Sequence, residues 1–409
     1  MGKKKLIVIG GGAAGFFCAV NAARLSPSLE VVVLEKTGKL LSKVRVSGGG
    51  RCNVTHSCFD ITDMAKRYPR GKNFVKRSFH RFFTSDTIQW FEERGVKLKA
   101  EKDGRMFPVT DNSETIINCL LREADRYGVM VMTGIAVTDI RPQGNKFVVA
   151  TDKENMDADF VCVASGGFPK KEQYDWLRSL PHTIVPPSPS LFTFNAPSHP
   201  ITKLMGIAVE EAEIRIPALK EKEKGPLLIT HWGLSGPAVI RLSAWLARDL
   251  EAMHYKAEVL INWLPEFNEN SFREYIIGFR DRNGSVKPRS RSSFGLPQRL
   301  WEFLLSESGI GDQRWSELSS VQQNRLVRNI VSYSIQISGK TTFKEEFVTA
   351  GGITLSELDP DTMQSKLIPG LYFAGEIVDV DGITGGFNFQ HAWTSGFNAA
   401  NDIAQKSLN

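Results

Sequence analysis

Residues 6–15, Leu-Ile-Val-Ile-Gly-Gly-Gly-Ala-Ala-Gly, decide the fold of this chain. Four apolar residues lead into glycines at positions 10, 12 and 15, and an apolar segment continues to Leu25. A second apolar run, residues 31–34, ends at Glu35. This order predicts a strand, a glycine turn, a helix and a second strand closed by an acid, which is the dinucleotide-binding fingerprint.

Each position of the fingerprint has a physical role. Gly10 permits the tight turn, Gly12 lets the backbone approach a pyrophosphate, and Gly15 lets the helix pack closely on the strand. The helix that starts at Ala13 offers unpaired N–H groups and a positive dipole end to the phosphates. Glu35 is placed to accept hydrogen bonds from ribose hydroxyls. A glycine-rich turn in an ordinary α/β core would not explain this acid.

Composition and charge limit the classes of protein to which the chain can belong. Its 409 residues are enough for two or three domains, and 42% apolar and 23% charged residues are typical of a soluble globular protein. No apolar run approaches the roughly 20 residues of a membrane helix. The net charge of +6 is explained by binding of an anionic cofactor or substrate. We therefore expect a soluble protein that does not bind a membrane.

The cysteines argue for a reducing compartment. There are five, an odd number, and none forms a Cys-x-x-Cys pair. A disulfide framework or a zinc site is therefore not expected, and we predict a cytoplasmic protein without a bound metal.

A second glycine string, Ser-Gly-Gly-Gly-Arg-Cys-Asn, occupies residues 47–53. Consecutive glycines such as Gly49 and Gly50 let the backbone run against a flat ring or a phosphate, and Arg51 supplies fixed donors. Cys52 is either a redox thiol beside a flavin or, as we favour, a packing or polarising group. The alternative is a surface turn with a free thiol.

Two later segments complete a nucleotide-binding sheet. Residues 160–163 form a buried apolar strand that ends in small residues, and residues 371–373 form another that ends in Gly375-Glu376. The acid at this second strand end can hold ribityl hydroxyls. Gly385 and Gly386 precede a helix whose first N–H groups, from residues 387 to 390, can stabilise the negative charge of a reduced flavin. Together these segments predict FAD rather than NAD alone.

The motifs at both ends of the chain resemble the BaiN-like NAD(P)/FAD-dependent oxidoreductases, a family of bacterial flavoproteins. The resemblance rests on Lys43, on the string 47–53 and on residues 230–237, 362–366, 375–376, 379–382 and 385–390. The chain departs from the family pattern at His56, where Asn is common, and at Phe387 and Phe389, which replace Tyr and Leu.

The resemblance implies a Rossmann-like α/β fold with a discontinuous FAD-binding domain of the two-dinucleotide type. A proline-rich stretch, residues 181–200, marks the exit from this domain. We predict the FAD domain at 1–185 and 343–409 and an inserted substrate or cap domain at 186–342. Within the insert we expect a β-barrel part at 186–265 and 331–342 and a helical part at 266–330.

The predicted cofactor contacts combine the fingerprint, the second glycine string, a hairpin near the adenine and both C-terminal turns. They are Gly10, Gly12, Ala13, Ala14, Gly15, Glu35, Lys36, Lys43, Gly49, Gly50, Arg51, Cys52, Asn53, Val137, Ser165, Gly166, Gly375, Glu376, Gly385, Gly386, Phe387, Asn388, Phe389 and Gln390.

The predicted activity is that of an FAD-dependent oxidoreductase that transfers hydride through flavin N5. No second fingerprint is present, so NAD(P)H would visit the flavin transiently or another reductant would serve. Some members of the family reduce a conjugated C=C, and we expect such an enone in a small organic or steroid-like acid. The acid that protonates the substrate is unassigned, with His231 and His391 as candidates, and Cys52 is a further catalytic candidate.

Two alternatives stay open. The first is a flavin-dependent RNA-modifying protein, for which the sequence offers its net charge and the basic loop 287–291, although a solvated loop is the simpler interpretation and nucleic acid is not the expected partner. The second is a non-catalytic flavin-binding sensor. The sequence does not predict an oligomeric state.

Overall fold

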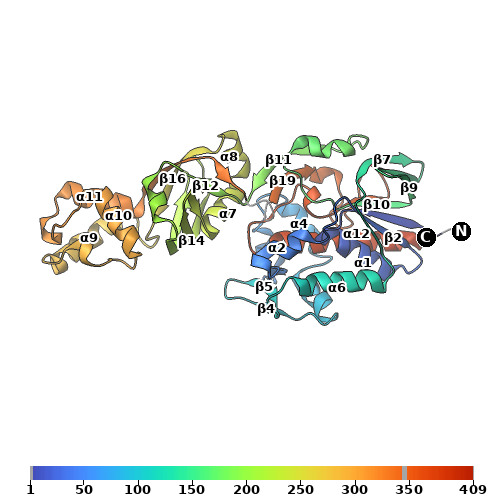
Figure 1. The fold of residues 1–409 in the computed structure, drawn as a ribbon, viewed down its shortest axis with the longest axis horizontal. Helices are drawn as coiled ribbons and strands as arrows, with labels where there is room; N and C mark the ends of the chain where they lie inside the picture. Colours follow the sequence, from blue (N-terminus) through green and yellow to red (C-terminus); the bar gives the residue numbers. More distant parts are fainter. Residues whose placement is uncertain (1–2, 343–347, 409) are drawn as a thin grey trace. The chain divides into compact units, whose positions relative to one another are not determined.

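A parallel sheet of five strands, in the order β20-β10-β1-β2-β6, forms the centre of the first part of the structure (Figure 1). Its strands are β1 (Lys5–Ile9), β2 (Glu30–Glu35), β6 (Met130–Thr133), β10 (Phe160–Val163) and β20 (Leu371–Phe373). Val8 in β1 aligns with Cys162 on one side and with Val33 on the other. The central strands are apolar and buried between their ends, because both faces of the sheet are covered.

Two helices from opposite ends of the sequence pack together beside this sheet. They are α1 (Ala13–Leu25) and α12 (Phe387–Ser407). The ring of Phe17 in α1 lies 5.2 Å from that of Trp393 in α12, and both side chains are fully buried. The last helix thus belongs to the same core as the first helix. This core is complete only when residues from both ends of the sequence are in place.

Smaller elements surround the sheet. The helices are α2 (Ser42–Gly50), α3 (Ile61–Ala65), α4 (Lys72–Ser78), α5 (Thr84–Glu92) and α6 (Glu114–Arg126). One small sheet contains β3 (Thr55–His56), β4 (Leu98–Ala100) and β5 (Arg105–Pro108), and another contains β7 (Val137–Gln143), β8 (Lys146–Thr151) and β9 (Asn155–Ala158). A third pairs β11 (Ile184–Ser190) with β19 (Val348–Ile353).

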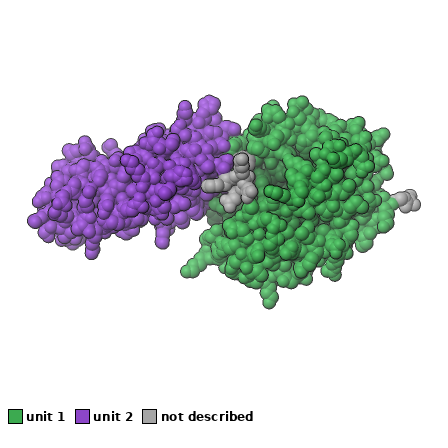
Figure 2. Space-filling view, in the orientation of Figure 1, with its two compact units in different colours: residues 1–190, 344–409 green, residues 191–343 purple. Residues whose placement is uncertain are grey.

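The computed structural model describes residues 3–342 and 348–408, and the chain divides into two units (Figure 2). The first unit contains residues 1–190 and 344–409, and the second contains residues 191–343. The first segment therefore ends after Ser190 rather than after residue 185, because β11 pairs with β19 of the same unit. Residue 343, at which the FAD domain was predicted to resume, lies outside the described residues.

An antiparallel sheet of seven strands, in the order β17-β16-β13-β14-β15-β12-β18, forms one part of the second unit. Its strands are β12 (Thr193–Asn195), β13 (Ala208–Arg215), β14 (Lys222–Thr230), β15 (Gly233–Ser235), β16 (Lys256–Asn262), β17 (Tyr333–Ser338) and β18 (Lys340–Thr341). Only Gly339, with φ 104°, separates β17 from β18, although these strands stand at opposite ends of the order. The sheet therefore curls into a barrel, with α7 (Pro237–Trp245) and α8 (Ala247–Ala252) against it.

Three helices form the other part of the second unit. They are α9 (Glu269–Asn283), α10 (Gln298–Glu307) and α11 (Ser320–Val331). Asn268 caps α9 by accepting from Asn270 N and Ser271 N, and Ser319 caps α11 by accepting from Gln322 N. In the described ranges no helix is both long and apolar enough to cross a membrane.

Candidate functional site

The carboxyl ends of four neighbouring parallel strands bring the predicted cofactor residues together. Gly10 follows β1, Glu35 closes β2, Ser165 follows β10 and Gly375 follows β20. Ligands of open α/β sheets bind outside this edge. Segments that lie far apart in the sequence thus form one site.

The fingerprint turn has a closed side and an open side. A Cβ added to Gly10, whose φ is 114°, would lie 2.4 Å from Ala164 O, and one added to Gly15 would lie 1.9 Å from Gly10 O. Neither position can hold a side chain. Gly12 differs, because its φ is −93° and no described atom lies within 4 Å of an added Cβ. Gly12 caps α1, and its open face leaves the helix N-terminus accessible to an anion.

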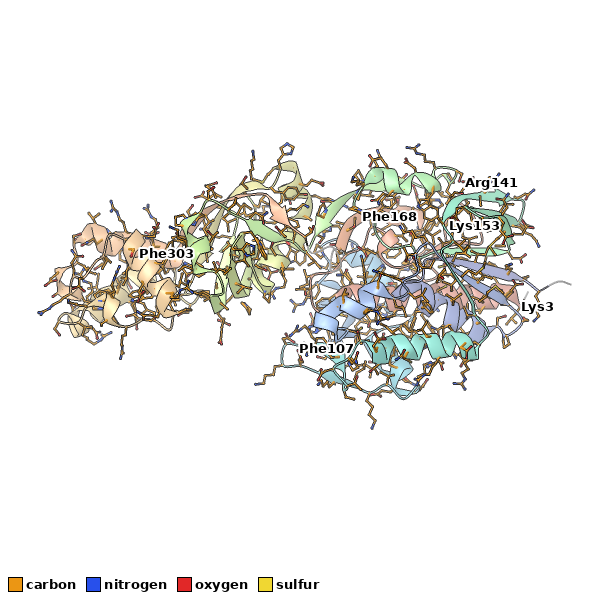
Figure 3. All side chains as sticks on the ribbon, viewed as in Figure 1. Lys3, Phe107, Arg141, Lys153, Phe168 and Phe303 are labelled. Carbon is orange, nitrogen blue, oxygen red and sulfur yellow. The ribbon has the colours of Figure 1, made fainter. Side chains whose placement is uncertain are left out.

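The acid of the fingerprint lies over this turn. Glu35 accepts a hydrogen bond from Gly11 N at 2.9 Å and another from Thr37 N at 2.9 Å. Next to it, Lys36 Nζ lies 5.2 Å from the ring centroid of Phe168, which is labelled in Figure 3. The chain that enters β7 passes the same place, since Ile135 N donates to Glu35 O at 3.0 Å. Val137 begins β7 and aligns with Thr151 in the small sheet.

The second glycine string ends α2 in a left-handed turn. Gly49 and Gly50 have φ of 70° and 83°, and an added Cβ at either position meets no described atom within 4 Å. With its amide oriented to satisfy both neighbours, the Asn53 side chain donates to Thr55 O at 3.0 Å and accepts from Gly386 N at 2.9 Å. This amide joins the N-terminal string to the C-terminal turn.

Arg51 and Cys52 contact other protein groups, unlike Gly49 and Gly50, whose faces are open. The Arg51 guanidinium pairs with Glu101 at 2.6 Å and lies 3.9 Å from the ring centroid of Phe107 (Figure 3). Its donors therefore hold the β4–β5 hairpin. Cys52 is fully buried, and burial raises the pKa of its thiol to about 12 although a hydrogen bond to Ser47 opposes the shift. A thiol with this pKa is protonated at neutral pH, which supports a packing role over thiolate chemistry.

A charge pair connects the two ends of the sequence at the third turn. Lys43 Nζ in α2 forms an ion pair with Glu376, and the other carboxylate oxygen of Glu376 accepts from Thr349 N at 2.8 Å. An added Cβ on Gly375 would lie 2.8 Å from Ala14 Cβ, so this turn packs on the start of α1. The acid predicted to hold ribityl hydroxyls is thus already oriented by two protein donors.

The start of α12 is held tightly by its neighbours. An added Cβ on Gly386 would lie 2.5 Å from Thr55 O, and one on Gly385 would lie 2.6 Å from the Phe387 ring. The Asn388 side chain accepts from Gly382 N at 2.8 Å and donates to Gly382 O at 2.9 Å. These contacts fix the direction in which the helix N-terminus points.

Aromatic side chains pack around the same turn. Tyr68 Oη donates to Phe387 O at 2.6 Å, and the His56 ring meets the Phe387 ring edge-on at 4.8 Å. Phe389 stacks on Trp393 at 5.8 Å. Both phenylalanines therefore contribute apolar packing at the start of α12.

Gln390 differs from the prediction that its N–H is a donor to the cofactor. Its backbone N–H donates to Gly386 O at 3.0 Å, which is the first bond of the helix ladder. Its side chain is fully buried and accepts from Thr55 Oγ1 at 2.6 Å and from Thr87 Oγ1 at 3.1 Å. Only the first three N–H groups of α12, those of residues 387–389, precede this ladder.

Three buried polar groups at this edge test whether a cofactor fits. Within the described ranges Ser165 Oγ, Thr349 Oγ1 and both ring nitrogens of His391 have no hydrogen-bond partner. Buried polar groups are normally paired with protein, ligand or ordered water, so these atoms are available to a polar ligand. Together with the open faces of Gly12, Gly49 and Gly166, they fit a large polar cofactor such as FAD. Burial also lowers the pKa of His391 to about 4 and keeps its ring neutral at pH 7.

The other catalytic candidate, His231, lies in the second unit. It occupies the exposed turn between β14 and β15, where its ring is 4.4 Å from that of Trp232. Its role in catalysis stays a prediction. Among the residues that the structure describes, no group of three or more His, Cys, Asp or Glu could hold a metal ion.

Sequence reasoning missed Thr349 and one buried ion pair. Thr349 precedes the glycines at 351 and 352, and that pair was the available signal. Asp381 is fully buried, and Arg70 Nε donates to its Oδ1 at 2.5 Å while Ser190 Oγ donates to its Oδ2 at 2.9 Å. No local pattern connects residues so far apart in the chain.

The parallel sheet, its fingerprint turn and the return of the C-terminus to the same edge define a Rossmann-type flavoprotein of the oxidoreductase class. The model of the HI0933-like protein Rossmann domain matches residues 4–402. The chain therefore belongs to this family, and the resemblance drawn from its motifs is confirmed.

Known proteins resemble the chain over almost its whole length. It is 29% identical to a 3-dehydro-bile acid delta(4,6)-reductase of Clostridium scindens and 30% identical to a ribosomal RNA dihydrouridine synthase of Haemophilus influenzae, in each case over 98% of both proteins. A 3-ketosteroid-delta4-(5alpha)-dehydrogenase of Rhodococcus jostii has the same fold, with a TM-score of 0.52, 12% identity and 98% of each chain covered.

Proposed function

We propose that the protein is an FAD-dependent reductase of a C=C bond conjugated to a carbonyl, with NAD(P)H as the electron donor. The observation that carries the proposal is the cluster of unpartnered buried polar groups and open glycine faces at the carboxyl edge of the sheet. A large polar cofactor would satisfy those groups.

The residues present fit FAD in three places. The turn at Gly12 and the start of α1 would hold the pyrophosphate, and Glu35 lies where the adenosine ribose would be bound. The N-terminus of α12 and Glu376 would hold the flavin end. When bound, FAD supplies hydride transfer between a nicotinamide and a substrate.

The two relatives support the type of bond that is reduced. The C. scindens protein is named for reduction of a bile acid double bond, and a dihydrouridine synthase saturates the C5=C6 bond of uridine. In a 3-dehydro-4-ene steroid and in uridine alike, the reduced carbons are conjugated to a carbonyl. The overall reaction would consume one NAD(P)H and one proton for each double bond and release NAD(P)⁺.

The protein groups at α12 would contribute electrostatically. The first three N–H groups of α12, which precede the helix ladder, and the positive end of a helix of 21 residues favour negative charge at this place. His391 is neutral at pH 7 because burial holds its pKa at about 4, so it would act as a hydrogen-bonding group and not as an imidazolium acid.

Rapid anaerobic mixing of the purified holoprotein with NADH or NADPH tests the proposal. We expect loss of the visible flavin absorbance with one of them, followed by recovery when an enone substrate is added. No loss with either nicotinamide would contradict the proposal and favour a non-catalytic flavin-binding sensor. A panel of conjugated ketones, including 3-dehydro-4-ene steroid acids, would then define the substrate.

Uracil in RNA is the second candidate substrate. It is supported by the relative of 30% identity that is a ribosomal RNA dihydrouridine synthase and by the net charge of +6. Mass spectrometry of ribosomal RNA incubated with the holoprotein and NADPH would show a gain of two hydrogens at a uridine. Reduction of steroid enones without any change in RNA would reject this candidate.

A further inference from the structure

A cavity in the helical part of the second unit is separate from the residues of the proposed FAD site. It is a pocket of about 510 Å³, open to solvent on one side, between α9, the loop that follows it and the short helical turn Trp315–Glu317. Small-molecule sites usually measure about 300–1,000 Å³. The volume is thus sufficient for a planar base with its sugar and phosphate.

Aromatic rings form part of the wall. The rings of Phe279 and Phe294 are 4.9 Å apart and partly exposed, and Phe279 lies 5.2 Å from the buried ring of Trp315. Asn283 also lines the cavity and donates through Nδ2 to Phe279 O at 2.9 Å, so its side-chain oxygen stays available as an acceptor. Rings that stack and an amide that bonds a base edge are the usual means of holding a nucleobase.

Two cationic residues, Lys287 and Arg291, line the cavity, and Lys287 is paired with an acid. Residues 284–297 include Lys287, Arg289 and Arg291 and no acidic residue, and none of the residues that line the cavity is Asp or Glu. Lys287 Nζ lies 2.5 Å from Asp312 at the surface. Arg291 is exposed and has neither an ion pair nor a hydrogen bond within the described ranges. A guanidinium beside stacked rings suits a phosphate attached to a base.

The backbone at the wall is strained. Phe294 has φ 62°, a region in which a bulky residue is an outlier, and such outliers cluster at ligand sites. Its ring packs against Phe272 at 5.3 Å and Trp301 at 5.6 Å. This packing fixes the ring as a preformed part of the wall.

We infer that this cavity binds one nucleotide of single-stranded RNA, with the base against Phe294 and its aromatic neighbours and the phosphate at Arg291. The inference rests on the RNA branch of the proposed function for the source of the nucleotide. A free nucleotide, NADPH included, has the same chemistry, and the experiment separates the two sources.

Fluorescence anisotropy of the holoprotein with a labelled uridine-rich RNA octamer measures the binding. Phe294→Leu keeps apolar bulk and removes the stacking face, so we expect affinity to fall roughly five- to one-hundred-fold. Arg291→Gln should weaken binding and reduce the slope of log affinity against log salt by about 0.7, the value for one phosphate on a single strand. Arg325→Gln, an exposed arginine on α11 that does not line the cavity, is the matched control and should bind as the unaltered protein does.

The outcomes separate the possibilities. Loss of RNA binding in both cavity variants but not in the control, without competition by AMP or NADPH, supports an RNA site, and competition by either supports a free nucleotide in the same cavity. Equal binding by Phe294→Leu and the unaltered protein, or equal loss in Arg291→Gln and Arg325→Gln, overturns the inference. RNA binding through the cavity without uridine reduction would reject the RNA branch of the proposed function and leave the site standing.

Discussion

Replacement of Gly12 by valine changes one place in the fingerprint turn without obstructing the rest of the protein. The φ of Gly12, −93°, is one that valine adopts, and no described atom lies within 4 Å of the added Cβ. The new side chain therefore enters only the space assigned to the pyrophosphate. The helix cap is weakened, because valine is a poor N-cap residue, at a cost of about 1 kcal/mol.

The expected loss of flavin affinity follows from the contacts that the side chain would displace. The N-terminus of α1 offers N–H groups to an anion, and each hydrogen bond to a charged group contributes about 1.5–3 kcal/mol. Loss of two such bonds amounts to about 3–6 kcal/mol, which weakens binding on the order of 10²- to 10⁴-fold.

The assay is titration of deflavinated protein with FAD, followed by the change in flavin fluorescence. Gly311→Val is the matched control, since Gly311 lies in the second unit and an added Cβ there also meets no described atom within 4 Å. Circular dichroism of both apoproteins checks that they are folded. If Gly12→Val purifies fully loaded with flavin while the fold is intact, the pyrophosphate assignment is wrong.

Three further predictions concern buried groups. Burial lowers the pKa of His391 to about 4 in the folded protein, so the unfolded chain takes up the proton first as pH falls below about 6.5. Acidification from pH 6.5 to 4 should remove about 3 kcal/mol of stability, and His391→Asn should lose that much less, as followed by thermal denaturation at each pH. Arg70→Ala leaves the carboxylate of Asp381 buried without its guanidinium and should destabilise the first unit by about 3–5 kcal/mol. The double variant Arg70→Met with Asp381→Leu removes both charges and should lose much less stability. Equal denaturation midpoints for the single and double variants would contradict this. Cys52, with its pKa raised to about 12 by burial, should resist alkylation by iodoacetamide at pH 8 in the native protein and react after unfolding, and mass spectrometry of the peptide would detect native labelling that refutes the assignment.

Local parts of the fold and the class of the site could be predicted from the sequence. The strand from Lys5, the turn at Gly10, the helix from Ala13 and the acid at Glu35 follow from spacing, because glycines and apolar periods act on the backbone within a few residues. The turn at Gly375 was recognisable for the same reason. These patterns, with the family resemblance, were sufficient to predict a Rossmann-like sheet and FAD.

The contacts that join the two ends of the chain are visible only in the folded protein. The pairs Lys43–Glu376 and Asn53–Gly386 join residues more than 300 positions apart, and no periodicity encodes such a contact. The structure also shows that the Arg51 guanidinium contacts Glu101 and Phe107 of the β4–β5 hairpin, although the sequence predicted that it contacts the cofactor.

The same distinction applies to the second unit. The sequence separated a barrel part from a helical part, but the closure of the barrel at Gly339 depends on which strand edges meet. The basic loop 287–291 looked like solvated chain in the sequence. Folding places it beside rings from α9 and from the turn at Trp315, because side chains that are distant in sequence share one apolar core, and this packing creates the cavity.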